Sequence, residues 1–321
     1  MSRFSITDLS QPVTDLDGPR DRDAAAGAAT ADLRPQGGKS HVAGDSSEPL
    51  WRITIPNLLA QTAERFAEHD AAVFPAHGVR WSYRELRRVS DELAAGLLAL
   101  GLEPGDRVGI WAPNRPEWVT VQFATARIGV IMVNINPAYR VGELEYALNK
   151  VGCKALVLAS EFKTSDYIGM IRNLAPELDD AEPGKLAAAR LPHLRTVVRM
   201  GAEKTPGMLN YDDVFALAGP AQRQRLDGIT AGLDPDDAIN IQFTSGTTGA
   251  PKGATLSHCN IVNNARFVTA TLRFSERDRL CIPVPLYHCF GMVMGVLGCV
   301  AHGATMVFPG EGFEPAATLA A

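Results

Sequence analysis

Apolar residues between positions 54 and 160 recur at helical spacing and in short buried runs. A first helix is expected from Pro56, because a proline in the first turn lacks only an N–H that would have no helical partner there. A second helix is expected after Ser82, which can form a capping box with Glu85, and it should end at Gly101. Strand-like runs lie at 107–111, 130–133 and 155–158, with helical patterns between them at 116–128 and 141–151. This alternation is typical of βαβ units and a mostly parallel sheet.

Residues 177–236 are rich in Pro, Ala, Asp and Gly, which is typical of a junction. Beyond them the pattern predicts strands at 238–243, 254–257, 280–284 and 304–308, and helices at 259–272 and 289–301. We therefore predict an α/β fold with two βαβ-type subdomains and mostly parallel sheets. The expected divisions are a disordered tail at 1–49, a first α/β subdomain at 50–180, a junction at 181–236 and a second α/β subdomain at 237–321.

One stretch, from 280 to 308, contains no Asp, Glu, Lys or Arg and could suggest a membrane segment. Pro283, Pro285 and Gly303 interrupt it, and a bilayer crossing needs about 20 uninterrupted apolar residues. We therefore expect no transmembrane segment. The tail at 1–49 has no apolar run long enough for a signal peptide, and its acidic residues disfavour a mitochondrial transit peptide.

The composition narrows the function classes. A chain of 321 residues with 46% hydrophobic content can bury a large core. Its net charge of −5, without basic runs interleaved with aromatic residues, argues against nucleic acid as a partner. None of the five cysteines is spaced as a metal-ligand pair, so we predict free thiols, no metal site among them, and a cytoplasmic location.

The most informative segment is 243–253, which reads Phe-Thr-Ser-Gly-Thr-Thr-Gly-Ala-Pro-Lys-Gly. Its glycines let the backbone approach an anion closely, its hydroxyl groups are donors, and Lys252 adds a compact positive charge. These features predict a polyphosphate site. The flanking patterns are both strand-like, so the phosphates should meet a strand-loop-strand and not a helix N-terminus.

Two well-known phosphate loops are excluded by spacing. A Walker loop requires a glycine before its lysine and Ser or Thr after it, but Pro251 precedes Lys252 and Gly253 follows. The dinucleotide fingerprint requires a glycine two residues after Gly246, where this chain has Thr248.

The segment resembles the signature of the adenylate-forming superfamily, and especially the AMP-forming fatty acid:CoA ligases. In that family an aromatic residue precedes Thr-Ser-Gly-Thr-Thr-Gly-x-Pro-Lys-Gly, and every position is matched here. Further agreement lies in Trp81-Ser82-Tyr83-Arg84-Glu85-Leu86, Gly105-Asp106-Arg107-Val108-Gly109, Asn114-Arg115-Pro116-Glu117 and Pro285-Leu286-Tyr287-His288-x-Phe290-Gly291.

The resemblance implies an enzyme that uses ATP, Mg²⁺ and CoA to activate a fatty acid through an acyl-adenylate. It implies that Lys252 accompanies the departing pyrophosphate and that His288 contacts the carboxylate or the α-phosphate. The β- and γ-phosphates would be held by the loop residues Thr244, Ser245, Gly246, Thr247, Thr248 and Gly249. The alternatives are a solvated surface lysine for Lys252 and a hydrogen-bonded core histidine for His288. His258 is expected to be structural, because it opens a helix.

The acyl pocket is less well defined by the sequence. Gly291, Gly295 and Gly298 could leave a groove for an aliphatic chain, and tight helix packing explains them equally well. The segment 136–140 (Asn-Pro-Ala-Tyr-Arg) resembles the fatty-acid branch of the family, which favours a medium or long acyl chain.

The chain also departs from the family pattern. No Thr-Glu dipeptide and no Thr-Gly-Asp occur, although the family uses these segments for adenine, Mg²⁺ and the ribose, and it places a further lysine in a C-terminal domain. We therefore expect an N-terminal portion that is inactive alone, with a partner chain as one source of the missing part. The alternative is a non-catalytic nucleotide- or acyl-binding fragment that acts through a partner.

Overall fold

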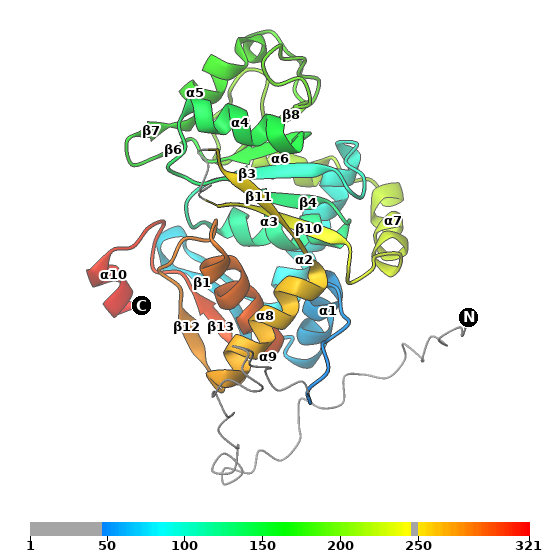
Figure 1. Ribbon diagram of the computed structural model, residues 1–321, viewed down its shortest axis with the longest axis vertical. Helices are drawn as coiled ribbons and strands as arrows, with labels where there is room; N and C mark the ends of the chain where they lie inside the picture. Colours follow the sequence, from blue (N-terminus) through cyan, green and yellow to red (C-terminus); the bar gives the residue numbers. More distant parts are fainter. Residues whose placement is uncertain (1–46, 245–249) are drawn as a thin grey trace, which may run out of the picture. The chain divides into compact units, whose positions relative to one another are not determined.

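A computed structural model describes residues 47–244 and 250–321, and Leu50–Ala321 forms one compact unit (Figure 1). The predicted mixed α/β fold with mostly parallel sheets is confirmed. The larger sheet has seven strands in the order β11-β10-β4-β3-β5-β8-β9. Its strands are β3 (Arg107–Trp111), β4 (Ile131–Asn134), β5 (Ala155–Leu158), β8 (Thr196–Arg199), β9 (Leu209–Asn210), β10 (Ala238–Thr244) and β11 (Lys252–Ser257). All neighbouring strands in it are parallel except β10 and β11.

A second sheet has four strands in the order β12-β13-β1-β2. They are β1 (Asp70–Phe74), β2 (Val79–Ser82), β12 (Arg279–Cys281) and β13 (Thr305–Val307). Each sheet therefore combines strands from before and after the junction expected at 181–236. A short hairpin of β6 (Glu161–Phe162) and β7 (Ser165–Asp166) stands apart.

The helices before the junction are α1 (Ile55–Arg65), α2 (Tyr83–Ala99), α3 (Pro116–Arg127), α4 (Val141–Val151) and α5 (Tyr167–Leu174). Helix α2 begins and ends where the sequence predicts, at Ser82 and Gly101. The expected capping box is present, since the Ser82 side chain accepts from the Glu85 N–H and the Glu85 carboxylate accepts from the Ser82 N–H. Gly101 has a φ of 77°, the left-handed conformation that ends a helix at glycine.

The later helices are α6 (Tyr211–Ala216), α7 (Pro220–Ala231), α8 (His258–Thr271), a π-helix η4 (Phe290–Leu297), α9 (Gly298–His302) and α10 (Pro315–Ala320). Three details differ from the expectation. The predicted helix at 289–301 is a π-helix for most of its length, and α7 lies within the expected junction. The strand predicted at 280–284 ends at Cys281, because Pro283 and Pro285 cannot donate to a sheet ladder.

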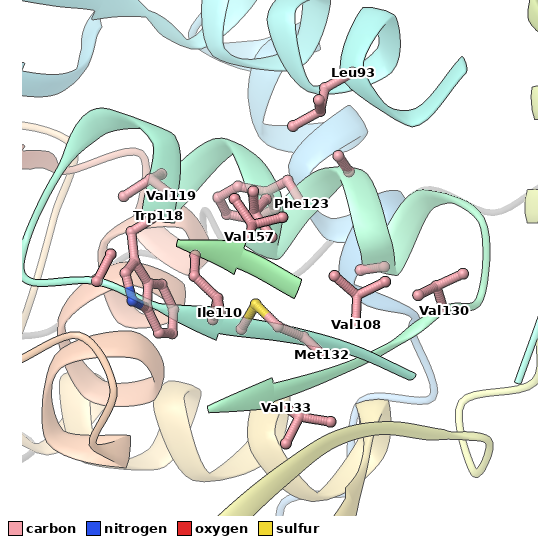
Figure 2. Close-up of a cluster of buried hydrophobic side chains, with 14 of the residues drawn as sticks. Leu93, Val108, Ile110, Trp118, Val119, Phe123, Val130, Met132, Val133 and Val157 are labelled. Carbon is pink, nitrogen blue, oxygen red and sulfur yellow. The ribbon is translucent and has the colours of Figure 1, made fainter. Parts of the chain in front are cut away.

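The core of the larger sheet is built against α3. Figure 2 shows Trp118 and Phe123 of α3 beside Ile110, Met132 and Val157 of three parallel strands. All five side chains are buried, and every residue of α3 from Trp118 to Ala126 is buried as well. This packing holds the carboxyl ends of β3 and β4 in place, where the loops of the candidate site begin. Within 47–244 and 250–321, no helix has both the length and the apolar character needed to cross a bilayer.

Candidate functional site

The candidate phosphate segment lies between two register-paired strands. Thr244 at the end of β10 pairs with Lys252 at the start of β11, and Phe243 pairs with Gly253. The predicted phosphate-binding residues Ser245, Gly246, Thr247, Thr248 and Gly249 lie outside the described residues. The predicted strand-loop-strand is therefore confirmed in its two strands, which differ from the strand-to-helix turn of a Walker loop.

Lys252 and Thr244 are both exposed at this hairpin. Within the described ranges no ion pair involves Lys252, whose side chain belongs to an exposed residue. Tyr146 of α4 fixes the base of the hairpin, because its hydroxyl donates to the carbonyl oxygen of Pro251 at 3.0 Å. Its ring also lies edge-on to that of Phe243, with 6.5 Å between centroids.

His288 lies in a tight turn between β12 and the π-helix η4. Its backbone N–H donates to the Pro285 carbonyl oxygen at 3.2 Å. The side chain is exposed, which contradicts the alternative of a core histidine. Its Nδ1 accepts a hydrogen bond from the N–H of Phe290 at 3.1 Å. A neutral ring therefore carries its proton on Nε2, where it can donate to a carboxylate or phosphate oxygen.

A cavity of about 480 Å³ opens beside this turn. Its walls come from the loops that follow β3 and β4, from the β6–β7 hairpin and from segments 283–287 and 311–313. Ligands in open α/β sheets bind beyond the carboxyl ends of the strands, and this cavity lies at that edge of the sheet. Most of the lining is apolar, for example Pro137 and Phe313, but Arg140 and Lys163 add two cations. Arg140 Nη2 donates to Thr164 Oγ1 at 3.1 Å.

One wall of the cavity is fixed by an ion cluster. The Arg115 guanidinium contacts the carboxylate of Glu311 at 2.5 Å and that of Glu117 at 3.2 Å. The backbone N–H of Asn114 donates to the Glu311 carbonyl oxygen at 3.1 Å. The Asn114-Arg115-Pro116-Glu117 motif thus holds segment 311–313 against the end of β3.

The glycines of the helix after His288 are explained by close packing. A Cβ atom on Gly291 would lie 2.4 Å from the Pro285 carbonyl oxygen, and one on Gly298 would lie 2.5 Å from Thr269 Cγ2. At Gly295 the nearest atom would be Ile282 Cδ1, at 3.1 Å. The spacing therefore reflects contacts of η4 and α9 with their neighbours, and it leaves no groove for an aliphatic chain at these positions.

His258 is structural, as expected, but its ring bonds to a distant backbone group and not to the start of its own helix. Ser257 caps α8, while the His258 ring is buried and its Nδ1 accepts the N–H of Ile55 at 3.1 Å. Burial lowers the pKa of His258 to about 4, because the charged ring would lose its hydration. Its Nε2 has no partner among the described residues.

The sequence reasoning missed the cavity and several polar residues behind it. Asn114, Asn134 and Asn240 are buried at the ends of or within apolar runs. A signal was available, since a polar residue closing an apolar strand faces the edge where ligands bind in α/β sheets. Asn114 and Arg140 lie in segments that resemble the family without indicating a ligand contact, and Lys163 has no signal in the sequence.

The sequence model of the AMP-binding enzyme family matches residues 59–321. Among curated proteins, the chain is 45% identical over 284 residues to the mitochondrial medium-chain acyl-CoA ligase ACSF2 of Danio rerio, covering 88% of this chain and 47% of the fish protein. With the Homo sapiens ACSF2 it shares 46% identity over 280 residues, covering 85% of this chain and 45% of the human protein. The chain thus spans about half the length of these relatives.

Solved structures agree with the fold. The chain is similar to apo MbtA of Mycobacterium smegmatis with a TM-score of 0.71 and 27% identity, covering 84% of this chain and 46% of that one. It also resembles the long-chain-fatty-acid-CoA ligase FadD1 of Archaeoglobus fulgidus, with a TM-score of 0.68 over 87% of this chain and 51% of that one. At 23% identity the second likeness concerns the fold alone.

Proposed function

The chain belongs to the family of AMP-binding enzymes, and from that premise we propose that it is the phosphate-binding part of an ATP-dependent acyl-CoA ligase. In the complete protein, a carboxylate oxygen of a medium- or long-chain fatty acid attacks the α-phosphorus of ATP. The bond from that phosphorus to the bridging oxygen breaks, and pyrophosphate leaves. The sulfur of CoA then attacks the acyl carbon of the adenylate, AMP leaves, and the thiol proton passes to solvent.

The observation that carries this proposal is the pairing of Thr244 with Lys252 at the two ends of the signature segment. An in-line attack at phosphorus needs donors and cations around the leaving group and no protein nucleophile. The exposed ammonium of Lys252 would neutralise charge on the departing pyrophosphate. His288 would donate from Nε2 to the carboxylate or the α-phosphate. Its Nδ1 is occupied by the Phe290 N–H, which orients the ring.

The cavity suits CoA better than the fatty acid. A fatty acid has one anionic group, and the chemistry requires that group at the α-phosphate. The cavity adds Arg140 and Lys163 to a largely apolar lining, and the carboxylate of Glu311 in its wall is paired with Arg115. The cavity therefore matches a ligand with an extended arm and phosphates of its own. We propose that the CoA arm enters here and that its thiol reaches the adenylate beside the His288 turn.

Mg²⁺ would accompany ATP in such a reaction. Within residues 47–244 and 250–321, no three side chains of His, Cys, Asp or Glu meet as ligands for a metal ion. Mg²⁺ at a nucleotide site is held mainly by phosphate oxygens and water with one or two carboxylates, so we assign no described residue and no step to the ion.

The test is acid-dependent exchange of pyrophosphate into ATP by the complete protein. Replacing Lys252 by Ala should lower the exchange rate at saturating acid by at least about a hundredfold, as removal of a group that stabilises transition-state charge does. The affinity for the acid should stay nearly unchanged. An unchanged rate with weakened acid affinity would place Lys252 in the acyl site instead. Binding of ATP and acid without any exchange would favour a non-catalytic binding protein.

A further inference from the structure

The turn that carries His288 lies beyond the ladder of the four-stranded sheet. The last ladder-like bond is from the Ile282 N–H to the Val307 carbonyl oxygen, at 2.8 Å. Pro283 and Pro285 follow, and neither has an N–H to donate. Buried backbone groups nevertheless need partners. Three backbone groups of this turn bond instead to the side-chain amides of two buried asparagines.

Asn114, in the loop after β3, satisfies two of these groups. Its Oδ1 accepts the N–H of Leu286 at 2.7 Å, and its Nδ2 donates to the Val284 carbonyl oxygen at 2.9 Å. The residue is only 2% exposed. The end of β3 and the turn are therefore joined by a two-point contact from a single side chain.

Asn134, the last residue of β4, satisfies the third group. Its Nδ2 donates to the carbonyl oxygen of Tyr287, the residue before His288, at 2.9 Å. Its Oδ1 accepts from Asn240 Nδ2 at 2.8 Å, and Asn240 also donates to the Met132 carbonyl oxygen at 3.0 Å. Asn240 lies on β10, the strand that ends at Thr244.

A continuous chain of amide hydrogen bonds therefore runs from β10 through Asn240 and Asn134 to the backbone next to His288. We propose that Asn134 is a positioning residue that, with Asn240 and Asn114, sets the place of His288 relative to the phosphate-binding hairpin. This inference rests on the proposed function, and it adds a role for residues outside the signature segment. The exposed ring of His288 contacts groups of its own turn, the Phe290 N–H and the Tyr287 ring, so the placement of the turn determines where the ring lies. Reaction rates respond steeply to such placement.

A purely structural role for the buried asparagine would make a different prediction. Asn210 on β9 offers the comparison, because it is also buried and its Nδ2 donates to the carbonyl oxygens of Gly201 and Glu203 at 2.6 and 2.8 Å. It lies in the strand at the far edge of the seven-stranded sheet from β10 and β11. Loss of the side-chain amide of Asn134 or of Asn210 should lower the free energy of unfolding by a similar amount. Only loss of the Asn134 amide should loosen the turn that carries His288.

The first test is amide hydrogen exchange of segment 284–292 in the chain and in three variants. In Asn134→Leu, exchange there should be roughly tenfold faster, since the turn loses a buried hydrogen bond. Asn240→Leu should also loosen this segment, although its own bonds reach Met132 and Asn134 and not the turn. Asn210→Leu should leave the segment unchanged. Should Asn134→Leu fail to fold, Asn134→Asp keeps the volume and the acceptor for Asn240, and its ionised carboxylate cannot donate to the Tyr287 carbonyl oxygen. Because it also buries a charge, its exchange in segment 284–292 is compared with that of Asn210→Asp, which buries the same charge away from the turn.

The second test is acid-dependent pyrophosphate exchange by the complete protein. Asn134→Leu should lower kcat by roughly tenfold or more and leave KM for ATP within about twofold, because the hairpin itself is intact. The double variant Asn134→Leu/Asn240→Leu should be little worse than Asn134→Leu. Equal effects of Asn134→Leu and Asn210→Leu in both tests would overturn the positioning role. Absence of exchange in the unmodified protein would refute the proposed function, while the hydrogen-exchange comparison would still decide whether the amide chain holds the turn.

Discussion

Replacement of His258 by Asn should make the free energy of unfolding less dependent on pH between about 7 and 4. The ring is fully buried, and burial lowers the pKa of His258 from 6.5 to about 4. Between these values the unfolded chain binds a proton that the folded chain does not. Stability therefore falls as the pH falls from about 7 towards 4. Asparagine keeps an acceptor near the position of Nδ1 for the Ile55 N–H, and it does not titrate.

The magnitude follows from linkage. A difference of 2.5 between 6.5 and about 4 corresponds to about 3 kcal/mol once the pH is below both values, and to about 2 kcal/mol already lost at pH 5. Asn is smaller than His, so His258→Asn should be less stable than the unmodified chain at pH 7.5. The difference in free energy of unfolding between the variant and the unmodified chain should be smaller by about 2 kcal/mol at pH 5.

The assay is urea unfolding followed by fluorescence at pH 7.5 and pH 5, with the free energy of unfolding extrapolated to water. His193→Asn, which removes an exposed histidine, is the matched control and should parallel the unmodified chain. Carboxylates titrate alike in all three proteins and cancel in the differences. An unchanged gap between His258→Asn and the unmodified chain at the two pH values would refute the reasoning.

Two further predictions concern the walls of the candidate site. Gly291→Ala should destabilise the fold by about 2 kcal/mol, because its Cβ would lie 2.4 Å from the Pro285 carbonyl oxygen. The control is Gly228→Ala on α7, where the new Cβ meets no atom within 4 Å. This variant should stabilise the helix by up to about 1 kcal/mol, because alanine has the higher helix propensity. Equal melting temperatures of the two variants would contradict the packing argument. In the complete protein, Arg140→Ala/Lys163→Ala should raise KM for CoA about tenfold and leave acid-dependent pyrophosphate exchange unchanged. A loss of that exchange with unchanged KM for CoA would assign the cavity to the fatty acid.

The elements of this fold are largely predictable because their signals are local. The capping box of Ser82 with Glu85 and the left-handed Gly101 depend on neighbours within one or two turns, and both are confirmed. The strands that flank the phosphate segment were also predicted, from apolar runs and the motif between them. Local patterns do not specify helix type, so the π-helix Phe290–Leu297 was expected as an ordinary helix.

Tertiary structure alone decided which segments meet at the site. Asn240 lies 106 residues after Asn134 in the chain, yet their side chains are hydrogen-bonded because β10 pairs with β4. Glu311 likewise contacts Arg115 across 196 residues, from the loop that follows β13. Hydrophobic periodicity says which face of a strand is buried and not which strand lies beside it. The sequence by itself therefore predicted the phosphate segment and determined the local elements, whereas strand order determined what surrounds His288.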